Sequence, residues 1–291
     1  MEEIFNIIEN SYRGYSRYLW HIITNPSWDN YFYWLIGVSL FFLIIEWIKP
    51  WRKDQPRFRQ DFWLDFFYMF FNFFLFYLII YGAASNVVVH FFNKLLASIG
   101  ITNLIAFEVM SWPTWAHLLV GFLVKDFVHF WVHRLLHRVD WLWQFHKVHH
   151  SVQQMGFAAH LRFHWMESVV YRAIQYIPLA LIGIGLRDFF IIHIFTLAIG
   201  HFNHANLKLN LGPLKYIFNN PQMHIWHHAE HLPEEKRYGV NFGITLSLWD
   251  YLFKTDYIPE DGRDVKLGFE NVENFPKSFL GQVFYGFRKN G

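Results

Sequence analysis

The chain has 291 residues, of which 54% are hydrophobic and 22% aromatic, whereas only 16% are charged. Such a composition excludes a disordered chain and favours surfaces that face lipid or lie deeply buried. The formal net charge of +2 gives no reason to expect a nucleic-acid partner, and the chain has no cysteine. Disulfides, thiolate catalysis and cysteine-ligated metals are therefore excluded. Any metal must be held by histidine and carboxylate groups.

Three apolar segments predict helices that are long enough to cross a membrane. Residues 31–48 contain a single charge, Glu46, and residues 66–89 carry no formal charge at all, which is the strongest membrane signal in the chain. Residues 115–132 begin as an apolar helix but become polar towards their end, so that this end is expected to face protein or water.

A helical hairpin is expected further along the chain. Residues 168–186 and 189–200 are largely apolar and are separated only by Arg187 and Asp188. This hairpin could dip into the bilayer or cross it. The fold class that we predict is therefore all-α, a polytopic membrane protein with about four to five membrane helices or hairpin segments.

The distribution of Lys and Arg predicts the orientation in the membrane. Residues 49–61 hold five of these cations, whereas residues 1–30 hold only two. The rule that cytoplasmic loops are rich in Lys and Arg places the 49–61 segment in the cytoplasm. The amino terminus and residues 90–114 then lie outside, and the chain returns to the cytoplasm near residue 133, where it remains if the hairpin does not change sides.

Histidine is unusually clustered. Of 18 histidines, 15 lie between positions 129 and 231. His133 and His137 are four residues apart and share one helix face. The pattern HxxHH occurs twice, at 146–150 and at 224–228. Each of these segments is about one helical turn, so that we expect its three imidazoles to converge on one centre.

Ten imidazoles exceed what one ion can use, because a four-coordinate zinc takes four ligands at most. We therefore predict two metal ions. The predicted ligands are His133, His137, His146, His149, His150, His201, His204, His224, His227 and His228. Ligating imidazoles usually donate their other N–H to a neighbouring acceptor. The candidate residues for this surrounding layer are Asp126, His129, His164, Glu167, Asn206, His231, Asn241 and Asp250.

Imidazole suits iron, copper, nickel and zinc alike, so context has to select the metal. A cluster where apolar spans meet the cytoplasmic face favours an O2-activating iron pair that attacks a lipid C–H bond. One alternative is a His-rich membrane metal transporter or metal-binding protein, which would carry its ligands near the middle of several spans. A zinc-dependent membrane hydrolase would need an HExxH motif, and the sequence has none.

From about residue 115 to 256 the chain resembles the fatty acid hydroxylase and sterol desaturase superfamily of integral-membrane di-iron enzymes. Asp126 with His133 and His137 resembles the first histidine box of that family. The 146–150 segment after Trp143 and the 224–228 segment after Pro221 are similar to the later boxes. One departure is the spacing of His201 and His204, which are three apart where some members have a pair four apart.

The resemblance implies a cytoplasmic helical cap that holds two iron ions over a membrane hairpin, and O2-dependent hydroxylation or desaturation of a lipid. It divides the chain into membrane helices at 1–114, a histidine-box fatty acid hydroxylase domain at 115–257, and a cytoplasmic tail at 258–291, all in one structural unit. Zinc is expected to substitute for iron in purified protein. No haem-binding His-Pro-Gly-Gly occurs, so we expect a separate electron donor of the cytochrome b5, ferredoxin or reductase type. We expect the bacterial inner membrane, with the endoplasmic reticulum as the alternative.

Overall fold

Helices form the body of the molecule in the computed structural model, which describes residues 1–287. Within that range the chain has no named strand, only isolated bridges between Phe218 and Leu246 and between Ala229 and Leu267. The predicted all-α class is confirmed. The α-helices are α1 (Glu2–Thr24), α2 (Tyr31–Ile48), α3 (Phe62–Phe70), α4 (Gly82–Ser98), α5 (Thr114–Arg138), α6 (Asp140–His150), α7 (Trp165–Leu181), α8 (Leu186–His204), α9 (Pro221–His227), α10 (Leu248–Phe253) and α11 (Phe279–Val283). Short 3-10 helices cover Phe157–Leu161, Gly212–Tyr216, Glu234–Lys236 and Val272–Asn274.

Three helices among the described residues are long and apolar enough to cross a membrane: Tyr31–Ile48, Phe62–Ser98 and Thr114–Arg138. They contain the three predicted segments. The second joins α3 to α4 through π-helical turns at Phe71–Leu75 and Tyr77–Tyr81, so it extends beyond the predicted span at both ends.

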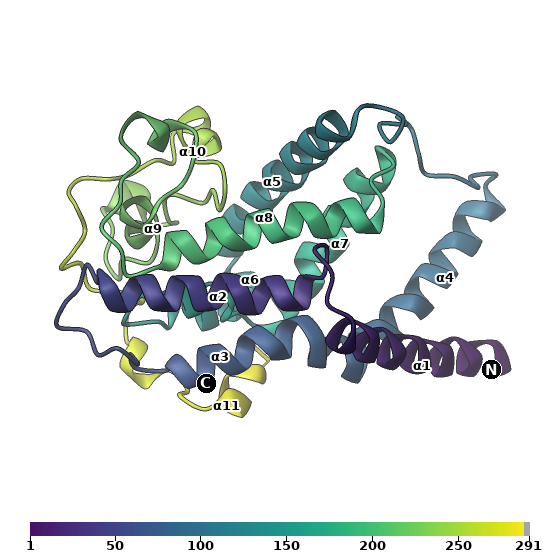
Figure 1. Cartoon of the computed structure of the whole chain (residues 1–291), viewed down its shortest axis with the longest axis horizontal. Coiled ribbons are helices and arrows are strands. Elements are labelled where there is room, and N and C mark those ends of the chain that lie inside the picture. Colours follow the sequence, from purple (N-terminus) through teal and green to yellow (C-terminus); the bar gives the residue numbers. More distant parts are fainter. Residues whose placement is uncertain (288–291) are drawn as a thin grey trace.

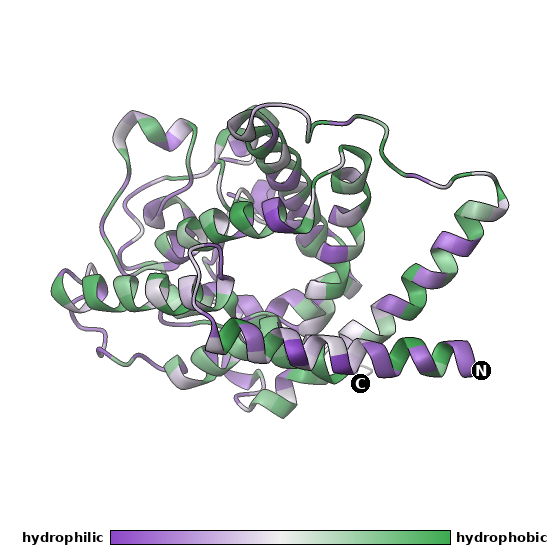
Figure 2. Ribbon diagram, turned by 45° about the vertical axis from the view of Figure 1, so that its right-hand side comes forward, coloured by the Kyte–Doolittle hydropathy of each residue, from purple (hydrophilic) through white to green (hydrophobic). Residues whose placement is uncertain are grey.

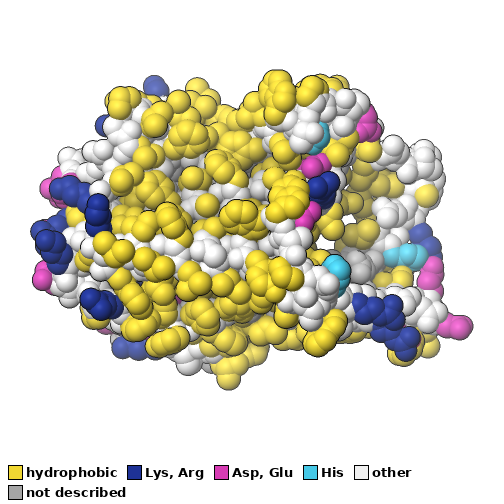
Figure 3. Space-filling model, in the orientation of Figure 1, with side chains coloured by type: hydrophobic (Ala, Val, Ile, Leu, Met, Phe, Trp, Pro, Cys, Tyr) yellow, Lys and Arg dark blue, Asp and Glu magenta, His cyan; other side chains and the backbone are white. Residues whose placement is uncertain are grey.

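Apolar side chains cover much of the outer surface of these helices. Leu40, Phe41, Ile44 and Ile48 of α2 are each more than half exposed. Figure 3 shows hydrophobic side chains over most of the face in view, with Lys and Arg gathered at its left and right ends. Because soluble proteins rarely expose so large an apolar surface, this surface fits a lipid environment.

The predicted hairpin is present as α7 and α8, but the predicted position of its turn is wrong. Residues 182–185 connect the two helices, whereas Arg187 and Asp188 belong to the first turn of α8. Gly183 provides a left-handed residue (φ 75°) just after α7, a conformation that glycine adopts readily. An acidic side chain in the first turn interacts favourably with the helix dipole, so the charged pair marks a helix start.

The segments that include α9 and α10, which we call the cap, lie at one end of the long helices, and α1 lies at the other end (Figure 1). α9 and α10 belong to the cap, whereas α1 and α4 lie together at the opposite end. No helix was predicted for the segment that forms α1, in which hydrophilic and hydrophobic residues alternate (Figure 2). The Tyr12 hydroxyl donates to the Ile79 carbonyl at 2.7 Å, and Glu3 pairs with Lys94 at 2.9 Å.

The C-terminal segment connects the cap to the long helices. Val265 and Leu267 pack in the cap core with Trp226. Farther along, the ring of Phe279 in α11 lies 4.8 Å from that of Phe67 in α3.

A buried polar network fixes the segment between α6 and α7. Arg162 is 1% exposed and donates to Asp61 at 3.0 Å and to Asp65 at 3.2 Å, and Asp65 also pairs with Arg59. In the π-helical turn, the Asn72 side chain donates to the carbonyls at 161 and 163. A charged group so deeply buried needs such partners. The network therefore holds residues 157–163 firmly against α3.

Candidate metal centre

Nine of the ten predicted ligands gather in two adjacent groups. In each group the ligand nitrogens all lie within 4.8 Å of one another. The first group consists of His133, His137, His146, His150 and His227. The second group consists of His149, His204, His224 and His228. All nine rings are buried except that of His137, which is partly buried.

Each HxxHH motif contributes to both groups, so the prediction that its three imidazoles converge on one centre is wrong. His146 and His150 of α6 belong to the first group, whereas His149 belongs to the second. In the segment at 224–228, His224 and His228 belong to the second group and only His227 belongs to the first. Residues four apart share a helix face, whereas adjacent residues diverge by about 100°. The last two histidines of each motif therefore point to different groups.

Backbone and carboxylate acceptors orient the rings. Nδ1 of His133 lies 2.7 Å from the Phe242 carbonyl, and Nδ1 of His227 lies 2.7 Å from the Val240 carbonyl. Nδ1 of His146 lies 2.8 Å from a carboxylate oxygen of Glu167.

In the second group, Nδ1 of His149 lies 3.0 Å from the Arg162 carbonyl, and Nδ1 of His204 lies 2.8 Å from the Gly200 carbonyl. A carbonyl accepts only, so both Nδ1 atoms must carry protons. The two Nε2 atoms of these neutral rings then present lone pairs to each other at 3.3 Å. A cation between the rings would remove this repulsion.

Burial keeps these imidazoles neutral. It lowers the pKa of His149 to about 3. Burial beside other imidazoles also holds the pKa values of His150, His224 and His228 well below the ordinary value for histidine. Neutral imidazole is the form that binds metal ions. In addition, the buried atoms Nε2 of His137 and Nδ1 of His228 have no hydrogen-bond partner. The donor set therefore fits two metal ions.

Three predicted outer residues hold the 240–250 segment instead of contacting a ring. Asp250 accepts from the backbone N–H groups of Phe242 and Gly243, both at 2.8 Å. Asn241 bonds the backbone of Met223 and Tyr257, and Asp126 accepts from the Trp249 indole at 2.9 Å. Glu167 is the predicted outer residue that bonds directly to a clustered ring.

The remaining predicted residues lie outside the two groups. His129 stacks on Tyr171 with ring centroids 4.3 Å apart, and His164 caps α7. Asn206 bonds the backbone at Arg52. The His231 side chain is 76% exposed.

His201 is the predicted ligand that neither group includes. Its Nε2 lies 3.0 Å from the Ser39 hydroxyl, and its Nδ1 lies 2.9 Å from Nδ1 of His160. Of the pair at 201 and 204, only His204 belongs to a group.

Some features of the site carry no side-chain signal in the sequence. The carbonyls of Val240 and Phe242 could not be identified as acceptors, because every residue has a carbonyl. Gly239 is an exception, because its residue type is required by the structure. It has a φ of 97°, and a Cβ there would lie 2.9 Å from Nδ1 of His137. A glycine so close to a histidine box could have indicated this approach.

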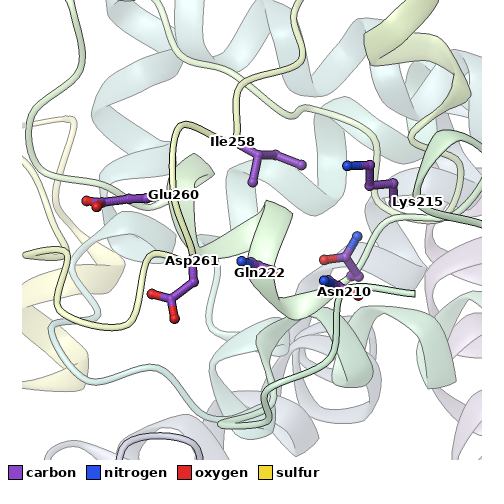
Figure 4. Close-up of a pocket in the computed structure, with 7 residues that line it drawn as sticks. Asn210, Lys215, Gln222, Ile258, Glu260 and Asp261 are labelled. Carbon is purple, nitrogen blue, oxygen red and sulfur yellow. The ribbon is translucent and has the colours of Figure 1, made fainter. Parts of the chain in front are cut away.

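A separate polar pocket of about 310 Å³ lies on the cap beside the start of α9. Figure 4 shows Lys215, Glu260 and Asp261 among the residues around it. None of its lining residues belongs to a histidine group.

Comparison with known proteins identifies relatives of this site. Residues 118–255 match the family model described as fatty acid hydroxylase. The ornithine lipid hydroxylase OlsE of Rhizobium tropici is 33% identical over 181 residues, which are 62% of this chain and 53% of that protein. An alkylglycerol monooxygenase of Xenopus tropicalis is 32% identical over 152 residues, 51% of this chain and 31% of that protein. A very-long-chain aldehyde decarbonylase of Oryza sativa subsp. japonica is 30% identical over 145 residues, 48% of this chain and 46% of that protein.

The chain thus spans about half the length of the ornithine lipid hydroxylase and about a third of the alkylglycerol monooxygenase. No solved structure gave a significant match. The part of the chain that matches the fatty acid hydroxylase family is thus the segment at residues 118–255.

Proposed function

We propose that this protein is a membrane-bound di-iron oxygenase that uses O2 and external electrons to hydroxylate or desaturate a C–H bond of a lipid. The observation that carries the proposal is the pair of adjacent buried imidazole groups, in which unprotonated nitrogens face one another. One ion cannot use nine imidazoles. The proposed ligands are the nine clustered histidines, and His201 is not among them.

Iron held by these residues would supply the oxidising power needed to remove hydrogen from an unactivated C–H bond. The chain itself fixes the ligand positions, because the Nδ1 contacts of His133, His149 and His227 leave little freedom of rotation. Burial excludes bulk water from the imidazoles, which limits side reactions of an oxidant formed there.

The reaction requires a separate reductant. Insertion of one oxygen atom from O2 into a C–H bond consumes two electrons and two protons, and the other oxygen atom leaves as water. Desaturation releases two water molecules and also needs two external electrons. We propose a cytochrome b5-, ferredoxin- or reductase-type donor.

The substrate is proposed to be a lipid with a long alkyl chain. The matched relatives are named for ornithine lipids, alkylglycerols and very-long-chain aldehydes, whose polar groups differ. Their shared feature is a long hydrocarbon chain. The long apolar helices next to the histidine groups suit such a chain, because hydrocarbon partitions into an apolar environment.

We propose the bacterial inner membrane as the location, with the endoplasmic reticulum membrane as the alternative, and the histidine groups on the cytoplasmic side. The cationic 49–61 segment supports this side, because it lies against the cap: the Arg52 guanidinium donates to the carbonyls of Gly262 and Arg263. Short loops rich in Lys and Arg favour the cytoplasm.

A metal transporter is less well supported. Its ligands would lie near the middle of several spans. Here six of the nine clustered histidines come from α6 and from the 224–228 segment, neither of which is a candidate membrane helix. In addition, His137 and His204 lie in the last turns of α5 and α8.

The test compares lipid extracts of a bacterial host with and without the gene by mass spectrometry, under isotopically labelled O2. We expect a lipid that gains one labelled oxygen atom or loses two hydrogen atoms. His149→Ala and His227→Ala, one from each group, should abolish the product while the protein remains in the membrane. His231→Ala, at an exposed position, is the matched control and should leave the product unchanged. No lipid change, together with no iron in purified protein, would refute the proposal.

A further inference from the structure

The two groups are unequal, and the missing member lies on α8. The first group has five imidazoles and the second has four. In α5, His133 and His137 are four residues apart and both belong to the first group. In α8, the residue four before His204 is Gly200, which has no side chain to contribute. The helical turn that supplies two ligands in α5 therefore supplies one in α8.

The ring of His160 occupies the space that a side chain at position 200 would fill. A Cβ built on Gly200 would overlap Nε2 and Cε1 of His160. The ring centroids of His160 and His204 are 5.2 Å apart. Within the second group, the centroid distances from His204 to its fellow members run from 4.2 to 5.3 Å. The ring of His160 is thus as close to that of His204 as the rings of those members are. Its nitrogens do not lie within 4.8 Å of all the ligand nitrogens of the second group.

A chain of hydrogen bonds determines which nitrogen of His160 carries the proton. The Ser39 hydroxyl is directed at Sδ of Met69, so that its oxygen is free to accept from Nε2 of His201. His201 then accepts at Nδ1 and receives the proton on Nδ1 of His160. Nε2 of His160, beside Gly200, is left with a lone pair. His133, His149 and His204 show the same pattern, with Nδ1 directed outwards and Nε2 directed into a group.

We propose that His160 is the fifth imidazole of the second metal site, and that it takes the place left vacant by Gly200. His201 is then a positioning residue, which fixes the tautomer of His160 and does not bind metal itself. This inference rests on the proposed function, because it requires the second ion. It explains why a chain with a glycine at position 200 carries a histidine in the 3-10 helix at 157–161, which packs against α8.

The test measures iron per chain and the rate of metal loss to a chelator, neither of which depends on turnover. Wild-type protein should hold about two ions. His160→Ala should retain about one, and His160→Gln should behave alike, since an amide can preserve the contact with His201 but is a poor iron ligand. Gly200→Ala should also lose the second ion, because the added methyl group displaces the His160 ring. His193→Ala is the matched control on the same helix, since that ring stacks on Phe189 away from the groups.

A rescue variant separates a ligand role from a packing role. In His160→Ala combined with Gly200→His, the new imidazole lies one turn before His204, and the second ion should return. Two ions bound in His160→Ala with wild-type loss rates would overturn the inference while leaving the proposed function intact. Failure of the double variant to regain the ion would count against it as well. Wild-type protein with one ion or none would instead refute the di-iron proposal itself.

Discussion

Asn241 holds the loop that orients two of the clustered imidazoles. It lies between Val240 and Phe242, whose carbonyls accept from His227 and His133. The fully buried Asn241 amide donates to the carbonyls of Met223 at 2.8 Å and Tyr257 at 2.7 Å, and its oxygen accepts from the Tyr257 N–H at 2.8 Å. Its backbone is left-handed, with a φ of 54°. Asparagine tolerates this conformation better than alanine does.

Asn241→Ala should destabilise the protein by about 2–5 kcal/mol. The unpaired N–H of Tyr257 contributes about 1–3 kcal/mol, and alanine in the left-handed region adds about 1–2 kcal/mol. The loop should then shift, and because ring-orienting partners typically change metal affinity by about 10- to 100-fold, iron retention should fall with stability.

The assay is the thermal midpoint in detergent together with iron per chain. Asn271→Ala is the matched control, since Asn271 has a φ of 61° and an exposed side chain, and it reports the backbone contribution alone. Asn241→Gly removes the backbone strain but not the loss of hydrogen bonds, so it should be more stable than Asn241→Ala by the backbone contribution. If Asn241→Ala is no less stable than Asn271→Ala and keeps its iron, the loop does not depend on this amide.

Three further predictions follow from the site. Glu167→Gln removes the carboxylate that accepts from His146 and should weaken iron binding by about 10- to 100-fold in a chelator competition; unchanged competition would contradict this. Gly239→Ala should displace His137, and the expected loss of iron from the first site is measured by metal analysis of the purified variant. Metal-free protein should become less stable as pH falls below about 6.5, because His149 has a pKa of about 3 when folded, so the unfolded chain binds more protons in that range. The expected slope is about 1.4 kcal/mol per pH unit for each such histidine, and a thermal midpoint independent of pH between 5 and 7 would refute it.

The long helices could be predicted because lipid-facing segments leave a local signal. Residues 31–48 and 66–89 lack interior charges, and each is contained in a helix of the structure. Helix ends were harder to locate. The sequence predicts the turn at Arg187 and Asp188, whereas the structure has it around Gly183. A charged pair occurs both in turns and in the first turn of a helix, whereas a residue in the left-handed conformation interrupts a helix.

The site was predictable in its members but not in their division between two groups. Nine clustered histidines were identified from spacing alone. Their division follows from the angle of about 100° between adjacent residues of a helix. The last two histidines of HxxHH are adjacent, and the prediction that all three converge on one centre did not take this angle into account. His160 was not among the predicted ligands, since its significance depends on Gly200, 40 residues away in the sequence, and on a tertiary contact.

The division of each HxxHH motif couples the two groups mechanically. α6 is a rigid body that carries ligands for both, and the 224–228 segment does the same in the opposite proportion. A small rotation of either element would therefore move donors of both ions at once. In wild-type protein, where both sites have all their ligands, loading is accordingly expected to be cooperative, with the first ion ordering the elements that receive the second. Half-loaded wild-type protein should then be scarce at equilibrium.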